Sequence, residues 1–110
     1  MSVTFNTNNP GDLLSLFKQA INNGHIRTWC YNKDGYYTHS AEQWKAKAWF
    51  LPKTTNGQLH FVIVRSQNQA VSTEVYAIFH GRLIEAMLAH FDKNFSTAAA
   101  TALPTSDDKV

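Results

Sequence analysis

Five histidines are the residues of this sequence best suited by type to acid–base chemistry or metal binding: His25, His39, His60, His80 and His90. An imidazole exchanges its proton near neutral pH and is a common metal ligand. No two of these histidines are four residues apart, the spacing that places two imidazoles on one face of a helix. The sequence therefore predicts no metal site and no cofactor.

Cys30 is the single cysteine and the strongest candidate nucleophile by type. Only a thiolate attacks, and a cysteine in apolar surroundings packs as a small hydrophobe. The alternation around Cys30 places it on the apolar side of an expected strand. Ser40, beside His39, has the spacing of a helix cap with Gln43 and not that of a catalytic triad. We therefore predict no catalytic residue and favour a non-catalytic protein, with a small enzyme that uses loop-side histidines as an alternative.

The composition predicts a small, soluble domain. The chain has 110 residues, of which 44% are hydrophobic and 13% aromatic, enough to build a packed core. Its net charge of +2 is too small to indicate a nucleic-acid or membrane partner. No apolar run approaches the roughly 20 residues that span a bilayer. We expect a cytoplasmic protein that does not contact the membrane.

The first expected element is an amphipathic helix over residues 10–23. Asn9 suits the N-cap and Pro10 the first helical position, whereas Asn23-Gly24 suits the end of a helix. Within this range the apolar side chains fall on one face, at helical spacing. They are Leu13, Leu14, Leu16, Phe17, Ala20 and Ile21.

The middle of the chain has the alternation and the turns of an antiparallel sheet. Asp34-Gly35 and Asn56-Gly57 are hairpin signals. The expected strands are 25–31, 36–38, 46–54, 58–65 and 71–79. A second amphipathic helix follows residue 79, with an apolar stripe of Leu83, Ile84, Met87, Leu88 and Phe91.

These elements predict an α+β fold: a four- to five-stranded antiparallel meander with the N-terminal and C-terminal helices packed on one face. We expect a single domain over residues 1–95, which carry nine basic and six acidic residues. Residues 96–110 contain one large apolar side chain before Val110, so we expect a disordered C-terminal tail.

Alternation assigns each strand residue to one of two sheet faces. The face expected under the helices is apolar or small: Ile26, Thr28, Cys30, Ala46, Ala48, Phe50, Leu59, Phe61, Ile63, Val75, Ala77 and Phe79. An open sheet face is normally polar. The opposite face here is rich in aromatic and aliphatic residues: Arg27, Trp29, Tyr31, Lys47, Trp49, Leu51, His60, Val62, Val64, Glu74, Tyr76 and Ile78.

Two interpretations of this second face remain open. In the first, residues 36–45, with Tyr36, Tyr37 and Trp44, or the N-terminal Val3 and Phe5 fold over this face as part of the core. In the second, the face is exposed and binds a macromolecule. We predict a small binding module for a protein partner, or a second copy of the chain, through these residues: Arg27, Trp29, Tyr31, Lys47, Trp49, His60, Glu74 and Tyr76. Single-stranded nucleic acid on the same aromatic face is the alternative partner.

Overall fold

The computed structural model describes residues 1–67 and 69–110 of the chain. Within them, six strands form one antiparallel sheet, accompanied by two helices. The α+β class is confirmed, and the sheet has one strand more than the upper expectation. The elements are β1 (Val3–Asn6), α1 (Pro10–Asn22), β2 (Trp29–Tyr31), β3 (Tyr37–His39), β4 (Ala48–Thr55), β5 (Gln58–Arg65), α2 (Thr73–Phe91) and β6 (Thr97–Ala100).

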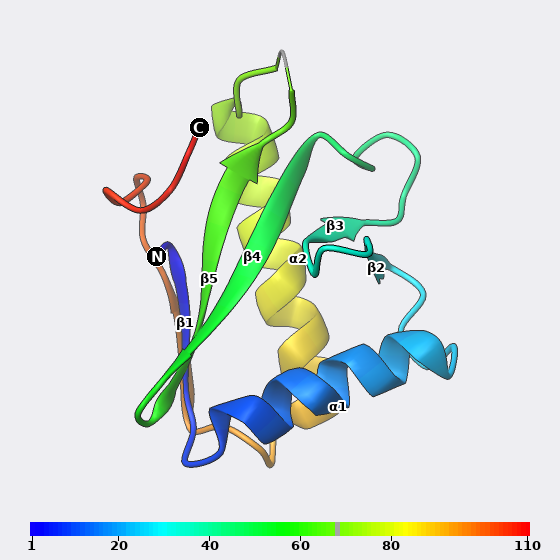
Figure 1. The fold of residues 1–110 in the computed structure, drawn as a ribbon, viewed down its shortest axis with the longest axis vertical. Helices are drawn as coiled ribbons and strands as arrows, with labels where there is room; N and C mark the ends of the chain where they lie inside the picture. Colours follow the sequence, from blue (N-terminus) through cyan, green and yellow to red (C-terminus); the bar gives the residue numbers. More distant parts are fainter. Residues whose placement is uncertain (68) are drawn as a thin grey trace.

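The strands are ordered β2-β3-β4-β5-β1-β6 (Figure 1). Strands β2 to β5 follow one another as a meander, as the turn signals predict. The chain ends complete the sheet, because β1 pairs with β5 on one side and with β6 on the other. Val3 lies opposite Phe61 in β5 and opposite Ala100 in β6.

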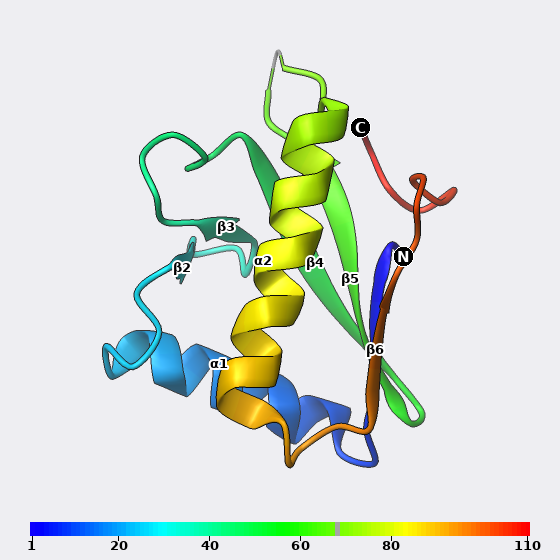
Figure 2. The same cartoon turned by 180° about the vertical axis from the view of Figure 1, so that it is seen from behind.

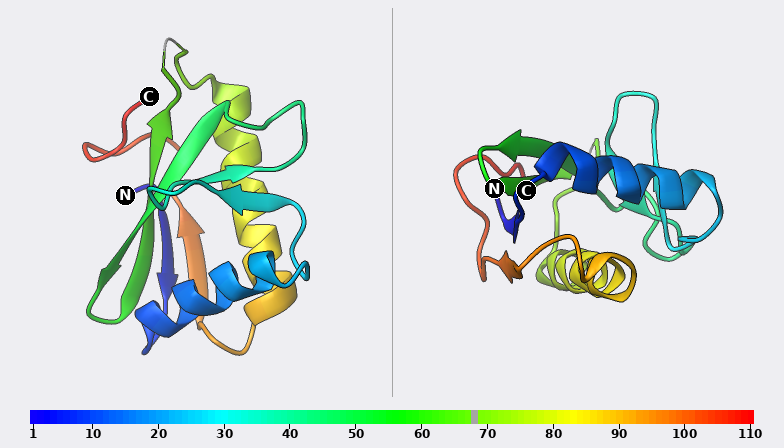
Figure 3. Two further views of the ribbon diagram at one scale, coloured as in Figure 1. Left: turned by 45° about the vertical axis from the view of Figure 1, so that its right-hand side comes forward. Right: turned by 90° about the horizontal axis from the view of Figure 1, so that it is seen from below.

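Both helices pack on the same face of the sheet. Helix α2 runs along β4 and β5 (Figure 2), and α1 crosses the end of the sheet near the β4–β5 turn (Figure 3). Phe17 of α1 stacks on Tyr37 with ring centroids 5.1 Å apart. Phe79 of α2 lies 6.1 Å from Phe50, whose ring also meets Phe61 at 5.8 Å. One aromatic core therefore joins both helices to the sheet. Neither helix of the described residues is long and apolar enough to cross a membrane.

The expected strand over residues 71–79 is wrong, because these residues begin helix α2. The Oγ of Ser72 accepts a hydrogen bond from the backbone N–H of Val75 at 3.1 Å, which is a helix N-cap. Val75 and Phe79 are four residues apart, so they satisfy a helical period as well as an alternating one. Alternation over such a short segment therefore does not distinguish the two structures.

The expected disordered tail also differs from the structure. Strand β6 pairs with β1, and Thr101 N–H donates to the carbonyl of Ser2 at 2.9 Å. Further along, an isolated bridge pairs Lys109 with Val64, and the carboxylate of Asp108 accepts from the backbone N–H of Ile63 at 2.9 Å. Backbone pairing, and not burial of large side chains, orders this segment. The number of large apolar side chains therefore does not predict whether this segment is ordered.

Candidate functional site

The outward face of β4 and β5 is the candidate functional site. We use this name for four side chains on the side of the two strands opposite the buried core: Trp49, Leu51, Val62 and Val64. Trp49 lies opposite Val64, and Leu51 lies opposite Val62. Val62 is buried, whereas the other three are half-buried. Their neighbours along the strands, Phe50 and Ile63, point into the core and are 0% exposed.

Neither of the two helices in the described part of the chain lies over this face. Figure 1 looks onto β4 and β5 with α2 behind them, and the view from below in Figure 3 places α2 on the other side of the sheet. Two of the three aromatic residues of segment 36–45 expected as a cover pack elsewhere: Tyr37 is buried against Phe17, and Trp44 packs against the main core. The outward face therefore keeps apolar side chains in partial contact with solvent.

The polar neighbour of this face is His60, which joins three strands. Its Nδ1 lies 2.9 Å from the Oγ1 of Thr4 in β1, and its Nε2 lies 3.0 Å from the Oγ1 of Thr55 in β4. Burial lowers the pKa of His60, so the imidazole is neutral at pH 7. With both nitrogens occupied, His60 holds the strands in register and is not a free base.

Two lysines flank the apolar side chains. Lys53 follows Leu51 by two residues and lies opposite His60, so alternation places it on the same face. Lys109 pairs with Val64 through an isolated bridge at the other end, and bridge partners share a sheet face. Both lysines are exposed. Strands β1, β4 and β5 contain no acidic residue, and the Asp108 carboxylate next to Lys109 accepts hydrogen bonds from the backbone N–H groups of Ile63 and Thr105.

Of the eight predicted binding residues, Trp49 belongs to this face and His60 borders it. Trp29 is 1% exposed and packs against Phe50 and Phe79, and Tyr76 of α2 is buried with its hydroxyl 2.9 Å from the Thr101 carbonyl. The prediction for Trp29 is wrong because β2 begins only at that residue. Alternation counted from residue 25 therefore gives the wrong face. Tyr76 was misplaced with the rest of the expected strand 71–79.

The other four predicted residues lie apart from the outward face. Tyr31 donates to the side-chain oxygen of Asn22 at 2.6 Å, and Arg27 donates to the carbonyl of Gly24 at 3.3 Å. Lys47 and Glu74 line a separate surface hollow beside Trp44. Sequence reasoning missed the two lysines that flank the face. Alternation beyond Leu51 could have found Lys53, whereas no local signal marked Lys109.

His80 and Ser2 form the hydrogen-bond pattern of a base and a nucleophile. The Nδ1 of His80 lies 2.6 Å from the carbonyl oxygen of Tyr76, which can only accept, so Nδ1 carries the proton. The Oγ of Ser2 then donates to Nε2 at 2.7 Å. The two residues are 4% and 1% exposed, so a substrate cannot reach them. The pair joins the start of β1 to α2.

The remaining candidates for chemistry are a metal site and the thiol of Cys30. Within it, no three His, Cys, Asp or Glu side chains lie close enough to hold a metal ion. Cys30 is half-buried, with its Sγ 3.7 Å from the carbonyl oxygen of Thr38.

Comparison with models of known protein families, with curated protein sequences and with solved structures gives no match.

The buried histidines predict a loss of stability in mild acid. Burial lowers the pKa of His39, His60 and His80 from the ordinary value of 6.5. Because the unfolded chain takes up these protons first, the stability is fully present above pH 6.5 and falls as the pH decreases below it. Each histidine contributes a slope of up to about 1.4 kcal/mol per pH unit. Urea unfolding at a series of pH values measures this, and an unchanged midpoint between neutral and mildly acidic pH would contradict it.

Proposed function

We propose that this protein is a small non-catalytic binding module, and that the outward face of β4 and β5 binds an acidic, amphipathic segment of another protein. The observation that carries the proposal is the cluster of Trp49, Leu51 and Val64. These apolar side chains remain partly exposed on strands whose other face carries the fully buried Phe50, Phe61 and Ile63. Exposed apolar patches rimmed by polar groups commonly mark interaction sites, and tryptophan is a frequent anchor of interface energy.

Charge supports an acidic partner. Lys53 and Lys109 flank the apolar side chains, and the nearby carboxylate of Asp108 is occupied by hydrogen bonds from Ile63 and Thr105. A second copy of the chain would bring the same lysines together, and like charges facing each other oppose association. Nucleic acid usually requires several aromatic rings as a stacking platform, whereas Trp49 is the aromatic residue that this face contributes.

Reversing the charge of Lys53 tests the partner's chemistry. The protein retained by the immobilised chain after nuclease treatment is identified and purified, and its affinity is then measured by calorimetry. We expect Lys53→Glu to weaken binding by about tenfold and to reduce its dependence on salt, because a charge pair at the rim of the interface is replaced by repulsion.

Lys33→Glu is the matched control, since Lys33 is an exposed lysine in the turn between β2 and β3. We expect this variant to retain the affinity of the unaltered chain. Equal affinities for all three proteins would contradict the acidic partner. Retention of nucleic acid alone would contradict the proposed function.

A further inference from the structure

The chain contains two Asn-Gly pairs, Asn23-Gly24 and Asn56-Gly57, and the fold holds them differently. An asparagine before glycine can lose ammonia without a catalyst, because the glycine nitrogen can attack the side-chain carbonyl carbon of the asparagine. Glycine favours this reaction, since it has no Cβ to obstruct the approach. Both asparagines are exposed, and a Cβ added at either glycine would meet nothing within 4 Å. Exposure and crowding therefore do not distinguish the two pairs.

The peptide group between Asn56 and Gly57 is free to rotate. It lies in the two-residue turn between β4 and β5, whose last paired residues are Thr55 and Gln58. In the described part of the chain, neither the carbonyl oxygen of Asn56 nor the N–H of Gly57 makes a hydrogen bond. Rotation of this peptide group breaks no hydrogen bond of its own. The nitrogen of Gly57 can therefore turn toward the side-chain carbonyl carbon of Asn56.

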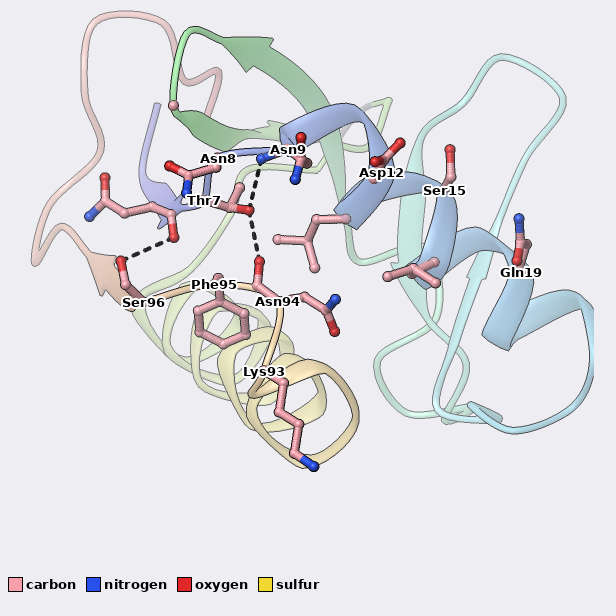
Figure 4. A pocket seen from close by; sticks show the side chains of 14 residues that line it. Thr7, Asn8, Asn9, Asp12, Ser15, Gln19, Lys93, Asn94, Phe95 and Ser96 are labelled. Carbon is pink, nitrogen blue, oxygen red and sulfur yellow. Dashed lines mark hydrogen bonds between the residues drawn. The ribbon is translucent and has the colours of Figure 1, made fainter.

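Water reaches this turn from a surface groove. Gly57 lines the groove beside the β1–α1 connection, where Thr7 N–H donates to the Gly57 carbonyl at 3.0 Å (Figure 4). The reaction needs hydroxide to remove the proton from the glycine nitrogen and water to complete it. Both come from solvent, so no catalytic side chain is required at the turn.

The end of α1 restrains the other pair. Asn23 N–H donates to the Gln19 carbonyl at 2.9 Å, and Gly24 N–H donates to the Ile21 carbonyl at 3.2 Å. Asn23 has a ψ of −1°, in the helical region. Ring closure requires rotation about its Cα–C bond, which would break the hydrogen bond of Gly24. We therefore expect Asn23 to react more slowly than Asn56.

We propose that Asn56 is a site of spontaneous deamidation, and that the end of α1 protects Asn23 from the same reaction. The Gly57 nitrogen gives its proton to hydroxide and forms a bond to the Cγ of Asn56. The bond between this Cγ and the side-chain nitrogen breaks, and ammonia leaves. Water then opens the resulting succinimide ring at either of its carbonyl carbons. The products are aspartate, with the original backbone, and isoaspartate, whose backbone runs through the side-chain carbon. Each adds one negative charge.

Isoaspartate changes the connection that closes the β4–β5 hairpin. Its backbone contains an additional carbon, whereas the pairing of Thr55 with Gln58 fixes the gap that the turn has to span. The turn is also tied to its surroundings by the bond from Thr7 to Gly57 and by the contact of Thr55 Oγ1 with His60 Nε2 at 3.0 Å. We therefore expect the isoaspartate form to unfold at a lower urea concentration than the unreacted chain.

Ageing the full chain in warm, mildly alkaline buffer tests the proposal, without any binding partner. Trypsin places the two asparagines in separate peptides, 19–27 and 54–65, and fragmentation mass spectrometry measures the conversion of each amide. In the folded chain we expect Asn56 to react at least about tenfold faster than Asn23, because Gly24 must first give up its hydrogen bond. In concentrated urea the two rates should become similar. Equal rates in the folded chain, or no reaction at Asn56, would overturn the proposal.

A pair of glutamine variants tests the assignment in the intact protein. Asn56→Gln keeps an exposed carboxamide, but its longer side chain would have to form a larger ring, which closes much more slowly. We expect this variant to lose the gradual acidic shift that ion-exchange chromatography detects. Asn23→Gln should keep the time course of the unaltered chain. Loss of the shift in Asn23→Gln, with its retention in Asn56→Gln, would overturn the assignment.

Asn56→Asp separates the added charge from the altered backbone. Freshly purified, it carries the charge of the reaction products on the original backbone, and we expect it to keep the urea midpoint of the unaltered chain. The isoaspartate form, isolated after ageing, should have a lower midpoint. Equal midpoints for the isoaspartate form and the unaltered chain would overturn the expected effect on the hairpin.

Discussion

Replacing Phe61 by alanine is expected to lower the free energy of unfolding by about 3–5 kcal/mol, a large part of the stability of a small domain. Phe61 is 0% exposed at the centre of the core. Its ring meets Phe5 of β1 at 6.0 Å, Phe17 of α1 at 6.4 Å and Phe50 of β4 at 5.8 Å. Truncation leaves a cavity between β1, α1 and β4, and urea unfolding measures the loss.

Thr54→Ala is the control for this measurement, because Thr54 is an exposed residue of the neighbouring strand β4. Its effect should stay within about 0.5 kcal/mol. A comparably small effect of Phe61→Ala would contradict the central position of β5 in the core.

Ending the chain after Phe95 is expected to destabilise the protein by about 3 kcal/mol or more, since several hydrogen bonds are lost and each unsatisfied buried group costs about 1–3 kcal/mol. The truncation removes β6 from the edge of β1. It also removes Thr101, the partner of the Tyr76 hydroxyl, and the Asp108 carboxylate bound to Ile63 N–H. Thermal unfolding of the shortened chain measures the effect.

A single substitution at Asp108 tests the hydrogen bonds of one side chain without removing the whole segment 96–110. Burial raises the pKa of Asp108, but hydrogen bonds from Thr105 and Ile63 lower it by more than burial raises it. The pKa therefore lies below its ordinary value, and the carboxyl group is ionised at neutral pH. Asp108→Ala should cost about 1–3 kcal/mol. Asp107→Ala, at an exposed neighbour, should cost little. An unchanged melting temperature after truncation at Phe95 would mean that residues 96–110 do not stabilise the fold.

The sequence predicts the elements that local signals define. Helix α1 follows from Pro10, its apolar stripe and Gly24, whose φ of +77° is a conformation that glycine adopts readily. The β4–β5 hairpin follows from the Asn56-Gly57 turn, and its register correctly places Phe50 and Ile63 in the core. Pairing that joins distant segments has no such signal. For this reason β1 and β6 were not predicted as strands.

The same distinction explains which site residues could be predicted. Trp49 and His60 belong to the hairpin whose register the turn defines, and they lie on the predicted side of the sheet. The face on which Trp29 lies depends on where a three-residue strand begins. The position of Tyr76 depends on whether a short apolar segment is helical or extended. Lys109 reaches the face through the pairing of the end of the chain with β5, which local patterns do not reveal.

The most direct test of the proposed binding surface is a pair of measurements on Trp49→Ala: urea unfolding, and affinity for the purified protein partner. Because Trp49 is half-buried on a face that neither of the described helices covers, we expect a small loss of stability, about 1 kcal/mol, with at least about thirtyfold weaker binding. Leu88→Ala removes an exposed apolar side chain of α2 and should leave the affinity unchanged. Unchanged affinity in Trp49→Ala, or a loss of stability of about 3–5 kcal/mol, would contradict the outward face of β4 and β5 as the binding surface.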